Sequence, residues 1–405
     1  MHKPASVFSL SAIQSAILQA VLLAALLVLL PAYAFSDSPS LQVYMQSFSV
    51  GDLHDKVETL QNASSDTTLS DAQTLYDAAI QFAFDNYAIL GHDIDMSTII
   101  GVSVSGLLEK KRTGKIDTLW KLFLDYPSHE TKAEILVALG TLGKRNQAII
   151  NNINNYLMEI NSQFKEGEPV DYMMVSACIA ALMELGDSSS YPVLFEILQA
   201  GYPEVIVFEA FGAMELISGD LRQFLAGVIE KNPPEEKFIA FRAGINSQRL
   251  SVSERGLLAE LALEQGLTAG EENASITAMR YSAVTALTNL RWTRANALAI
   301  RHYYMVLTDH LQDAIPKGRL IEAIACLGAV GNSDAALVLG LQLGLINART
   351  ENAGDYDADV TLAIVQALGN IGHNAAFDHL LYASALSYNE DIIAAARAAI
   401  DRLKW

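Results

Sequence analysis

Apolar residues recur every three or four positions from about residue 72 to the end of the chain, with polar residues between them. This spacing places apolar side chains on one face of an α-helix, so the pattern predicts a succession of amphipathic helices. Residues 35–71 are more polar, and the composition of residues 62–70 is that of a loop. We therefore expect a polar, partly ordered leader over 35–71 and a helical region over 72–405.

A six-residue motif recurs within the helical region: a small residue, then Leu, then an apolar residue three positions after the Leu, with Gly most often at the end. The final positions of two consecutive copies, Gly143 and Gly186, are 43 residues apart. Those of three later copies, Arg291, Gly331 and Gly372, are separated by 40 and 41 residues. Periods of this length are typical of two-helix units that stabilise one another by stacking. The copies occupy residues 138–143, 181–186, 286–291, 326–331 and 367–372.

Each position of the motif has a physical explanation. A small residue allows two helices to approach closely, and the Leu and the apolar residue after it share one helix face. The final Gly is expected to be the left-handed residue that ends the helix. We therefore predict an all-α fold, an α-solenoid in which helix pairs stack as a superhelix. The pattern is irregular near 220–280, where the segment 231–234 (Lys-Asn-Pro-Pro) interrupts the helical spacing.

On these motifs the chain resembles the HEAT-repeat superfamily, and most closely the short bacterial HEAT-like repeats of the phycobilin-lyase type. The resemblance covers about residues 72–403. It implies a curved helical scaffold that binds other macromolecules, without implying a particular ligand, because this fold hosts many functions. The four copies that carry it best are residues 138–143, 181–186, 326–331 and 367–372.

Residues 1–34 have the pattern of a signal peptide. Lys3 gives a basic start, Ala20–Leu30 is an unbroken apolar run, and Ala32-Tyr33-Ala34 matches the small-x-small cleavage pattern. We predict cleavage after residue 34 and an exported protein, periplasmic or associated with the cell envelope, without stable membrane insertion. An uncleaved anchor is the alternative, because Ile13–Leu30 approaches the length of a membrane span.

Composition and charge narrow the possible partners. Hydrophobic residues make up 51% of the chain and charged residues 18%, which argues against disorder over most of its length. The net charge of −19 should repel phosphate backbones, so nucleic acid is not an expected partner. The two cysteines, Cys178 and Cys326, are far apart in apolar helical segments, and we interpret them as buried thiols without a disulfide.

The search for chemistry yields no catalytic constellation, metal site or cofactor site. The sequence lacks a Walker loop, a Gly-x-Ser-x-Gly elbow, a Cys-x-x-Cys pair and a His-Glu-x-x-His motif. HEAT-like proteins resembling deoxyhypusine hydroxylase hold two irons with several His-Glu pairs, but His129-Glu130 is the only such pair here. The acidic segment 355–359 lacks the Gly and Glu that a calcium loop requires, so Asp357 or Asp359 is expected to cap a helix.

One segment combines cations and aromatic rings within this otherwise acidic chain. Such mixtures are typical of interface hot spots, although large rings packed between helices and covered by Arg stems give the same pattern. We take them as a candidate partner-binding patch, with helix packing as the alternative. The patch comprises Arg291, Trp292, Arg294, Arg301, Tyr303 and Tyr304.

The leading hypothesis is an exported HEAT-repeat scaffold or adaptor that mediates protein–protein interaction in the bacterial cell envelope, with no catalysis of its own. Its partner is expected to be a protein. The alternative is a chromophore-lyase-like or metal-binding enzyme on a HEAT-like scaffold, which only the resemblance supports. A structural envelope component, tethered by an uncleaved N-terminus, is a third hypothesis.

Overall fold

The computed structural model describes residues 41–69, 71–111, 114–268 and 273–404. Within these residues the structure is helical, with one isolated bridge and no strand. The prediction of an all-α fold is confirmed. The predicted signal peptide, residues 1–34, lies outside the described residues. None of the helices in the described part is both long enough and apolar enough to cross a membrane.

The chain divides into two compact units, Met1–Leu75 and Tyr76–Trp405. In the first unit, α2 (Leu41–Val50) packs on α3 (Leu53–Ser65) within the segment predicted as a polar leader. The loop expected over 62–70 begins only after α3 ends, because the buried side of that helix includes Leu60 and Ala63 and continues through the polar stretch. α4 (Ala72–Leu90) begins where helical periodicity was predicted to begin.

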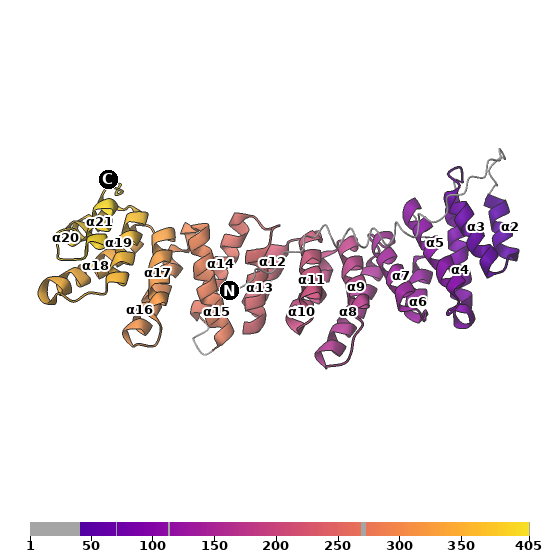
Figure 1. Cartoon of the computed structure of the whole chain (residues 1–405), viewed down its shortest axis with the longest axis horizontal. Helices are drawn as coiled ribbons and strands as arrows, with labels where there is room; N and C mark the ends of the chain where they lie inside the picture. The colour runs from indigo at the N-terminus through magenta and orange to yellow at the C-terminus, as the bar shows by residue number, and fades with distance from the viewer. Residues whose placement is uncertain (1–40, 70, 112–113, 269–272, 405) are drawn as a thin grey trace, which may run out of the picture. The chain divides into compact units, whose positions relative to one another are not determined.

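From α6 onward, the helices of the second unit form consecutive packed pairs, α6 with α7 through α20 with α21 (Figure 1). We call the odd-numbered helices from α5 to α21 the second-helix layer, and the even-numbered helices from α6 to α20 the first-helix layer. This stacking of helix pairs on their neighbours is that of an α-solenoid. The helices are α5 (Ile94–Lys110), α6 (Ile116–Asp125), α7 (His129–Leu142), α8 (Gln147–Lys165), α9 (Tyr172–Leu185), α10 (Tyr191–Ala200), α11 (Glu204–Leu216), α12 (Leu221–Lys231), α13 (Pro234–Asn246), α14 (Val252–Thr268), α15 (Ala274–Leu290), α16 (Asn296–Leu311), α17 (Lys317–Val330), α18 (Ser333–Ala353), α19 (Ala358–Ile371), α20 (Phe377–Ala383) and α21 (Glu390–Ile400), with 3₁₀ turns η1 (Ser188–Ser190), η2 (Thr293–Ala295) and η3 (Asn374–Ala376).

The repeated motif lies in the last turns of second-layer helices and makes their close contacts. The Gly at its third position packs on the first residue of the next copy. A Cβ atom on Gly140 would lie 2.6 Å from the Cα of Ala181, and one on Gly328 would lie 2.8 Å from the Cα of Ala367. The motif therefore sets the approach of α7 to α9 and of α17 to α19. Its Leu is fully buried at positions Leu139, Leu182, Leu287, Leu327 and Leu368.

The final Gly of the motif has two different roles. Gly186 and Gly372 are left-handed, with φ of 68° and 65°, as predicted. The prediction is wrong for Gly143 and Gly331, whose φ values are −84° and −71°. There the residue is small because space requires it, since a Cβ atom on Gly331 would lie 2.6 Å from the Cβ of Ala335.

Two parts of the stack repeat each other at an interval of 186 residues, which separates Asn161 from Asn347 and Tyr202 from Tyr388. The buried amide of Asn161 donates to a carbonyl of α10 at 3.1 Å and accepts from the Tyr202 hydroxyl at 3.1 Å. Asn347 likewise donates to a carbonyl of α20 at 3.0 Å and accepts from Tyr388 at 2.8 Å. The same kind of buried hydrogen-bond bridge therefore joins α8 to α10 and α18 to α20.

The middle of the chain, predicted as irregular near 220–280, contains α12, α13, α14 and the first part of α15. The two prolines separate two helices directly, because Lys231 ends α12 and Pro234 begins α13. Proline is tolerated at a first helical position, where its missing N–H would have no partner in the helix. The starts of α11 and α13 are only 30 residues apart, Glu204 to Pro234, so the 40-residue period is absent here.

The junction between the α10–α11 pair and the α12–α13 pair is the loosest place in the second-helix layer, because backbone contacts between α11 and α13 are sparse. Side chains bridge it instead. Arg249, after α13, donates to the Tyr191 hydroxyl at 3.1 Å and to the Ile217 carbonyl at 2.6 Å. In the second-helix layer the junction therefore depends on a few polar contacts, while aromatic rings of α10 and α12 pack across it in the first-helix layer.

Candidate protein-binding surface

α11 has an unusual distribution of apolar side chains. Apart from three glutamates, its sequence EVIVFEAFGAMEL contains only apolar and small residues. A helix that is apolar on all sides is normally buried. Yet Val205, Phe208 and Leu216 are 61%, 59% and 72% exposed. The solvent-facing side of α11 is therefore apolar along its length.

Two of the α11 glutamates bind neighbouring elements. Glu209 accepts a hydrogen bond from the Ser176 hydroxyl of α9 at 2.6 Å. Glu215 accepts from the main-chain N–H of Gln248, after α13, at 3.1 Å. These carboxylates connect α11 to the elements on its two sides, and only Glu204 remains as an exposed acid in its first turn.

The first turn of α9 continues this apolar surface. Tyr172 and Met173 are 44% and 41% exposed. The Tyr172 ring meets the Tyr202 ring edge-on at 6.3 Å, directly before α11 begins. Met173 lies one turn before Ser176, the residue that is hydrogen-bonded to α11, so it lies toward α11. We define the α9–α11 face as Tyr172, Met173, Val205 and Phe208.

An aromatic cluster supports one end of this face. The rings of Phe164 and Tyr202 are stacked with centroids 3.9 Å apart, and Tyr172 lies edge-on to both at 6.3 Å. Burial raises the pKa of Tyr202 to about 12, so its hydroxyl stays protonated and donates to Asn161. Tyr172 is thus packed against the half-buried Phe164 ring and the buried Tyr202 ring.

Carboxylates surround the α9–α11 face. Asp171 caps α9 by accepting from the N–H of Met173 at 2.9 Å, and its other oxygen lies 2.7 Å from Nδ1 of His129. Burial opposes ionisation of Asp171, but the hydrogen bonds from His129 and from the main chain hold its pKa below the usual value. The acids beside the face are Asp171, which directly precedes Tyr172, Glu204, which directly precedes Val205, and Glu130, which interacts electrostatically with Asp171.

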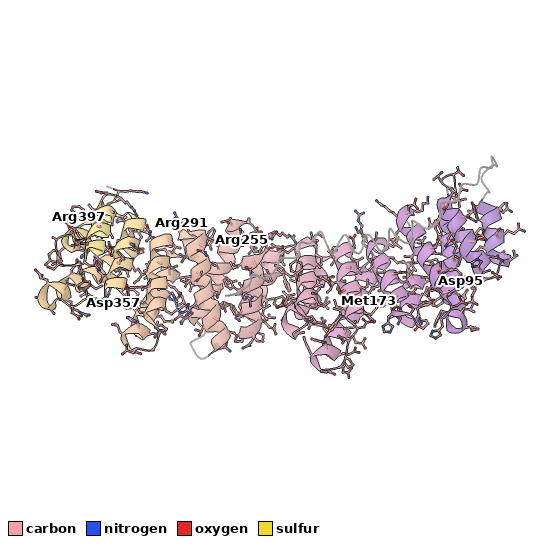
Figure 2. The ribbon with its side chains drawn as sticks, viewed as in Figure 1. Asp95, Met173, Arg255, Arg291, Asp357 and Arg397 are labelled. Carbon is pink, nitrogen blue, oxygen red and sulfur yellow. The ribbon has the colours of Figure 1, made fainter. Side chains whose placement is uncertain are left out.

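The acids of this rim lie at the starts of second-layer helices. Helices of the second-helix layer begin at one edge, where acids in the first turn complement the positive ends of the helix dipoles. Figure 2 shows Met173 and Asp357 at this edge and Arg255 and Arg291 at the opposite edge. The α9–α11 face therefore lies at the edge where the second-layer helices begin.

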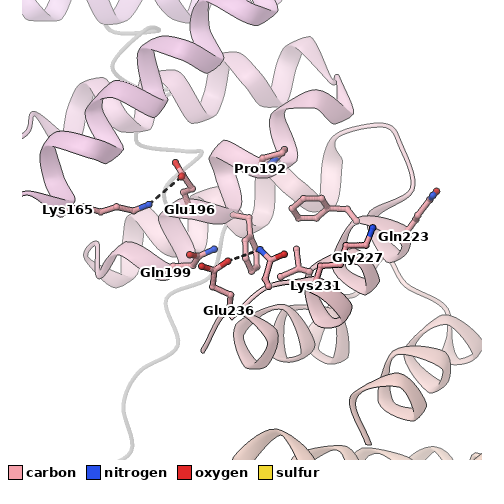
Figure 3. Close-up of a pocket in the computed structure, with 12 residues that line it drawn as sticks. Lys165, Pro192, Glu196, Gln199, Gln223, Gly227, Lys231 and Glu236 are labelled. Carbon is pink, nitrogen blue, oxygen red and sulfur yellow. Dashed lines mark hydrogen bonds and ion pairs between the residues drawn. The ribbon is translucent and has the colours of Figure 1, made fainter. Parts of the chain in front are cut away.

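A cleft of about 530 Å³ opens between α10 and α12, at the loose junction (Figure 3). The rings of Phe195 and Phe224 meet edge-on in it, with centroids 5.8 Å apart. At its rim Lys165 pairs with Glu196 at 3.3 Å. A Cβ atom on Gly227 would meet nothing within 4 Å. We interpret this cleft as a gap between helix pairs, because it lies at the loose junction, Lys165 pairs with Glu196, and Glu236 accepts a hydrogen bond from Asn232.

The structure divides the predicted patch into two groups. The indole N–H of Trp292 donates to Glu260 at 2.8 Å, and Nε of Arg294 donates to the same carboxylate at 3.1 Å. Arg291 ends α15 with a left-handed φ of 50°. Trp292 and Arg294 thus tie the segment at η2 to α14, whereas Arg291 is the C-cap of α15. Trp292 thus serves helix packing, which was the stated alternative for this segment.

The second group lies on α16, where Arg301 and Tyr304 are exposed but Tyr303 is only 1% exposed. Tyr303 is therefore a core residue and cannot reach a partner directly. Its neighbour His302 is equally buried, and its ring meets the Tyr281 ring edge-on at 5.6 Å. Burial, with a contribution from the positive charge of Arg280, lowers the pKa of His302 to about 3.

The other residues singled out in the sequence lie where a structural role requires. Cys178 and Cys326 are buried and free, and burial raises the pKa of Cys326 to about 11. Asp357 caps α19 as expected and pairs with Lys317 at 3.1 Å. His129 is exposed at the start of α7. In the part of the chain that the structure describes, three or more His, Cys, Asp or Glu side chains nowhere gather as metal ligands.

Comparison of the chain with models of known protein families and with curated proteins gave no match. The class of the protein therefore follows from its own geometry: an α-solenoid with an exposed apolar face on α9 and α11.

Proposed function

We propose that this protein is a protein-binding scaffold and that the α9–α11 face is its contact surface. The observation that carries the proposal is the exposed apolar side of α11, two of whose three glutamates bind neighbouring elements. Val205, Phe208 and Leu216 expose apolar surface without contributing to the chain's own core. Contiguous exposed apolar surface with a polar rim is characteristic of binding sites.

The proposal places the scaffold among the HEAT-like repeat proteins, supported by the recurrence near 40 residues and by the packing of Gly140 on Ala181. It also places the scaffold outside the cytoplasm, in the periplasm or at the bacterial envelope, supported by the signal-peptide pattern of residues 1–34. The alternative of an enzyme on the same scaffold gains no supporting observation from the described residues, so we do not propose it.

A photo-crosslinking experiment in the producing cells tests the contact surface. A benzophenone amino acid is placed at Phe208 or Val205, and in a matched variant at Leu337, an exposed apolar position of α18. We expect discrete adducts of one protein partner from the two α11 positions and none from position 337. Adducts of equal yield at all three positions, or adducts only at 337, would contradict the proposal.

A further inference from the structure

We infer that the partner segment is an amphipathic helix whose apolar side is flanked by lysine or arginine. This inference rests on the proposed function and adds the chemistry of the partner. It follows from three features of the α9–α11 face: its apolar surface, its two parallel helices and its acidic rim.

The apolar surface comes from two neighbouring helices of one layer. Tyr172 and Met173 begin α9, while Val205 and Phe208 occupy the first two turns of α11. The side chains of adjacent helices form ridges and grooves into which the ridge of a third helix can pack. Among the described residues there is no strand edge for an extended peptide to join, so the helix-in-groove mode of recognition fits this surface best.

The charge of the rim selects the flanks of that helix. Hydrogen bonds hold the pKa of Asp171 and of Glu130 below their usual values, so both are ionised at neutral pH. Lys165 pairs with Glu196 at 3.3 Å, and Nδ1 of His129 lies 2.7 Å from Asp171. A cationic flank would therefore meet the carboxylates of Glu130 and Glu204, whereas an anionic flank would be repelled.

The same charge argument disfavours a second copy of this chain as the occupant. Each copy carries a net charge of −19, so two acidic rims would face each other in a symmetric pair. The negative charge that would repel a second copy would attract a cationic partner helix. We therefore commit to a separate partner and treat self-association as a contradicting result.

The test measures binding of synthetic probe peptides to the full chain by fluorescence anisotropy. The first probe is a Leu/Lys peptide of about 18 residues, roughly five helical turns, with Leu at helical spacing on one side. The second has the same composition in shuffled order, and the third replaces every Lys by Glu. We expect the first probe to bind at least about tenfold more tightly than either control, a difference of about 1.4 kcal/mol.

Variants locate the binding on the chain. The double substitution Val205→Ser with Phe208→Ser should weaken binding of the first probe about tenfold or more, since apolar contact area is lost. Glu204→Lys should weaken it less, and the loss should shrink at high salt because screening removes the charge term. The matched control is Leu337→Ser with Leu341→Ser, which removes equally exposed apolar side chains from α18. Circular dichroism confirms that each variant remains helical.

Each contradicting outcome is distinguishable. Equal binding of the shuffled probe, or equal loss in the α18 variant, would show non-specific apolar adsorption. Tight binding of the Glu probe would overturn the cationic flank. Concentration-dependent dimers that Phe208→Ser abolishes would make a second copy the occupant. If no probe binds while crosslinking at Phe208 still captures a partner, this inference fails and the proposed scaffold function stands.

Discussion

At the residue scale, the two buried asparagines show how a single side chain can hold a repeat together. Asn161 and Asn347 each connect the first-layer helix that carries them to the next first-layer helix and to a tyrosine hydroxyl. A buried amide of this kind is costly to remove, because its former partners lose their hydrogen bonds without regaining water.

Asn161→Ala should therefore lower the free energy of unfolding by about 1 to 3 kcal/mol, since it leaves the Tyr202 hydroxyl and a carbonyl of α10 unsatisfied. Asn347→Ala should have a similar effect, because its contacts are the same. Urea unfolding followed by circular dichroism measures both. Asn155→Ala, an exposed substitution on the same helix as Asn161, serves as the control. Equal effects of Asn155→Ala and Asn161→Ala would refute the bridging role.

His302 makes stability dependent on pH. Its pKa is about 3 in the folded chain and about 6.5 when unfolded, so the unfolded state binds the proton more tightly. Above pH 6.5 His302 is neutral in both states and costs the native state no stability. As pH falls below 6.5 toward 3, the unfolded chain takes up the proton first, so the free energy of unfolding decreases. Between pH 7 and pH 4.5 the native state should lose about 2 to 3 kcal/mol through this group.

The measurement is urea unfolding at both pH values. His302→Leu should lose less stability than the wild type between pH 7 and pH 4.5, because it has no imidazole to protonate. His92→Leu, a substitution of an exposed histidine, should keep the wild-type dependence. If the His302→Leu and wild-type chains lose the same free energy, the buried imidazole does not control this window.

At the residue scale, the structure also explains why only part of the predicted patch reaches solvent. Sequence reasoning grouped Arg301, Tyr303 and Tyr304 by proximity along the chain. Consecutive residues of a helix point about 100° apart, so Tyr303 enters the core while Tyr304 is 49% exposed. Composition identifies which residues are suited to an interface, but the register of the helix on its neighbours decides which of them reach solvent.

At the element scale, the recurring motif made the fold predictable, because its small and apolar positions record helix contacts directly. The stacking of one second-layer helix on the next could be inferred where the motif recurs, as at Gly140 and Gly328. It could not be inferred between α11 and α13, where the interval shortens and Arg249 replaces close helix packing. The α9–α11 face was missed, although the all-round apolarity of residues 204–216 was its visible signal.

The packing role of the motif glycine predicts opposite effects at two glycines. Gly140→Val should destabilise the fold by about 1 to 3 kcal/mol, because even the first added carbon would lie 2.6 Å from Ala181. Gly227→Ala should stabilise it by about 0.5 to 1 kcal/mol, since Gly227 is helical and a Cβ there meets nothing within 4 Å. Thermal unfolding distinguishes the two. Equal destabilisation at both positions would contradict the packing argument.

At the scale of the whole molecule, the stacking of parallel second-layer helices produces both the fold and the position of the candidate surface. Because second-layer helices begin at one edge, the cap of α9, Asp171, and the first-turn acid of α11, Glu204, lie beside the α9–α11 face. In a repeat array the stability is approximately the sum of the repeats and their nearest-neighbour interfaces. The weakest interface then decides where the array separates.

That interface is the junction bridged by Arg249, and removing its guanidinium should uncouple the two sides of the stack. In Arg249→Ala the Tyr191 hydroxyl and the Ile217 carbonyl lose their shared donor, so the helices before and after the junction should unfold at different urea concentrations. Trp120 reports on the first side and Trp292 on the second, so variants that keep only one of them, with the other and Trp405 replaced by Phe, assign each transition. Arg222→Ala, which removes a long ion pair of 3.7 Å to Asp220, should leave the two transitions as coincident as in the wild type. If both signals shift together in Arg249→Ala, coupling across the junction is carried by the sparse helix contacts rather than by this side chain.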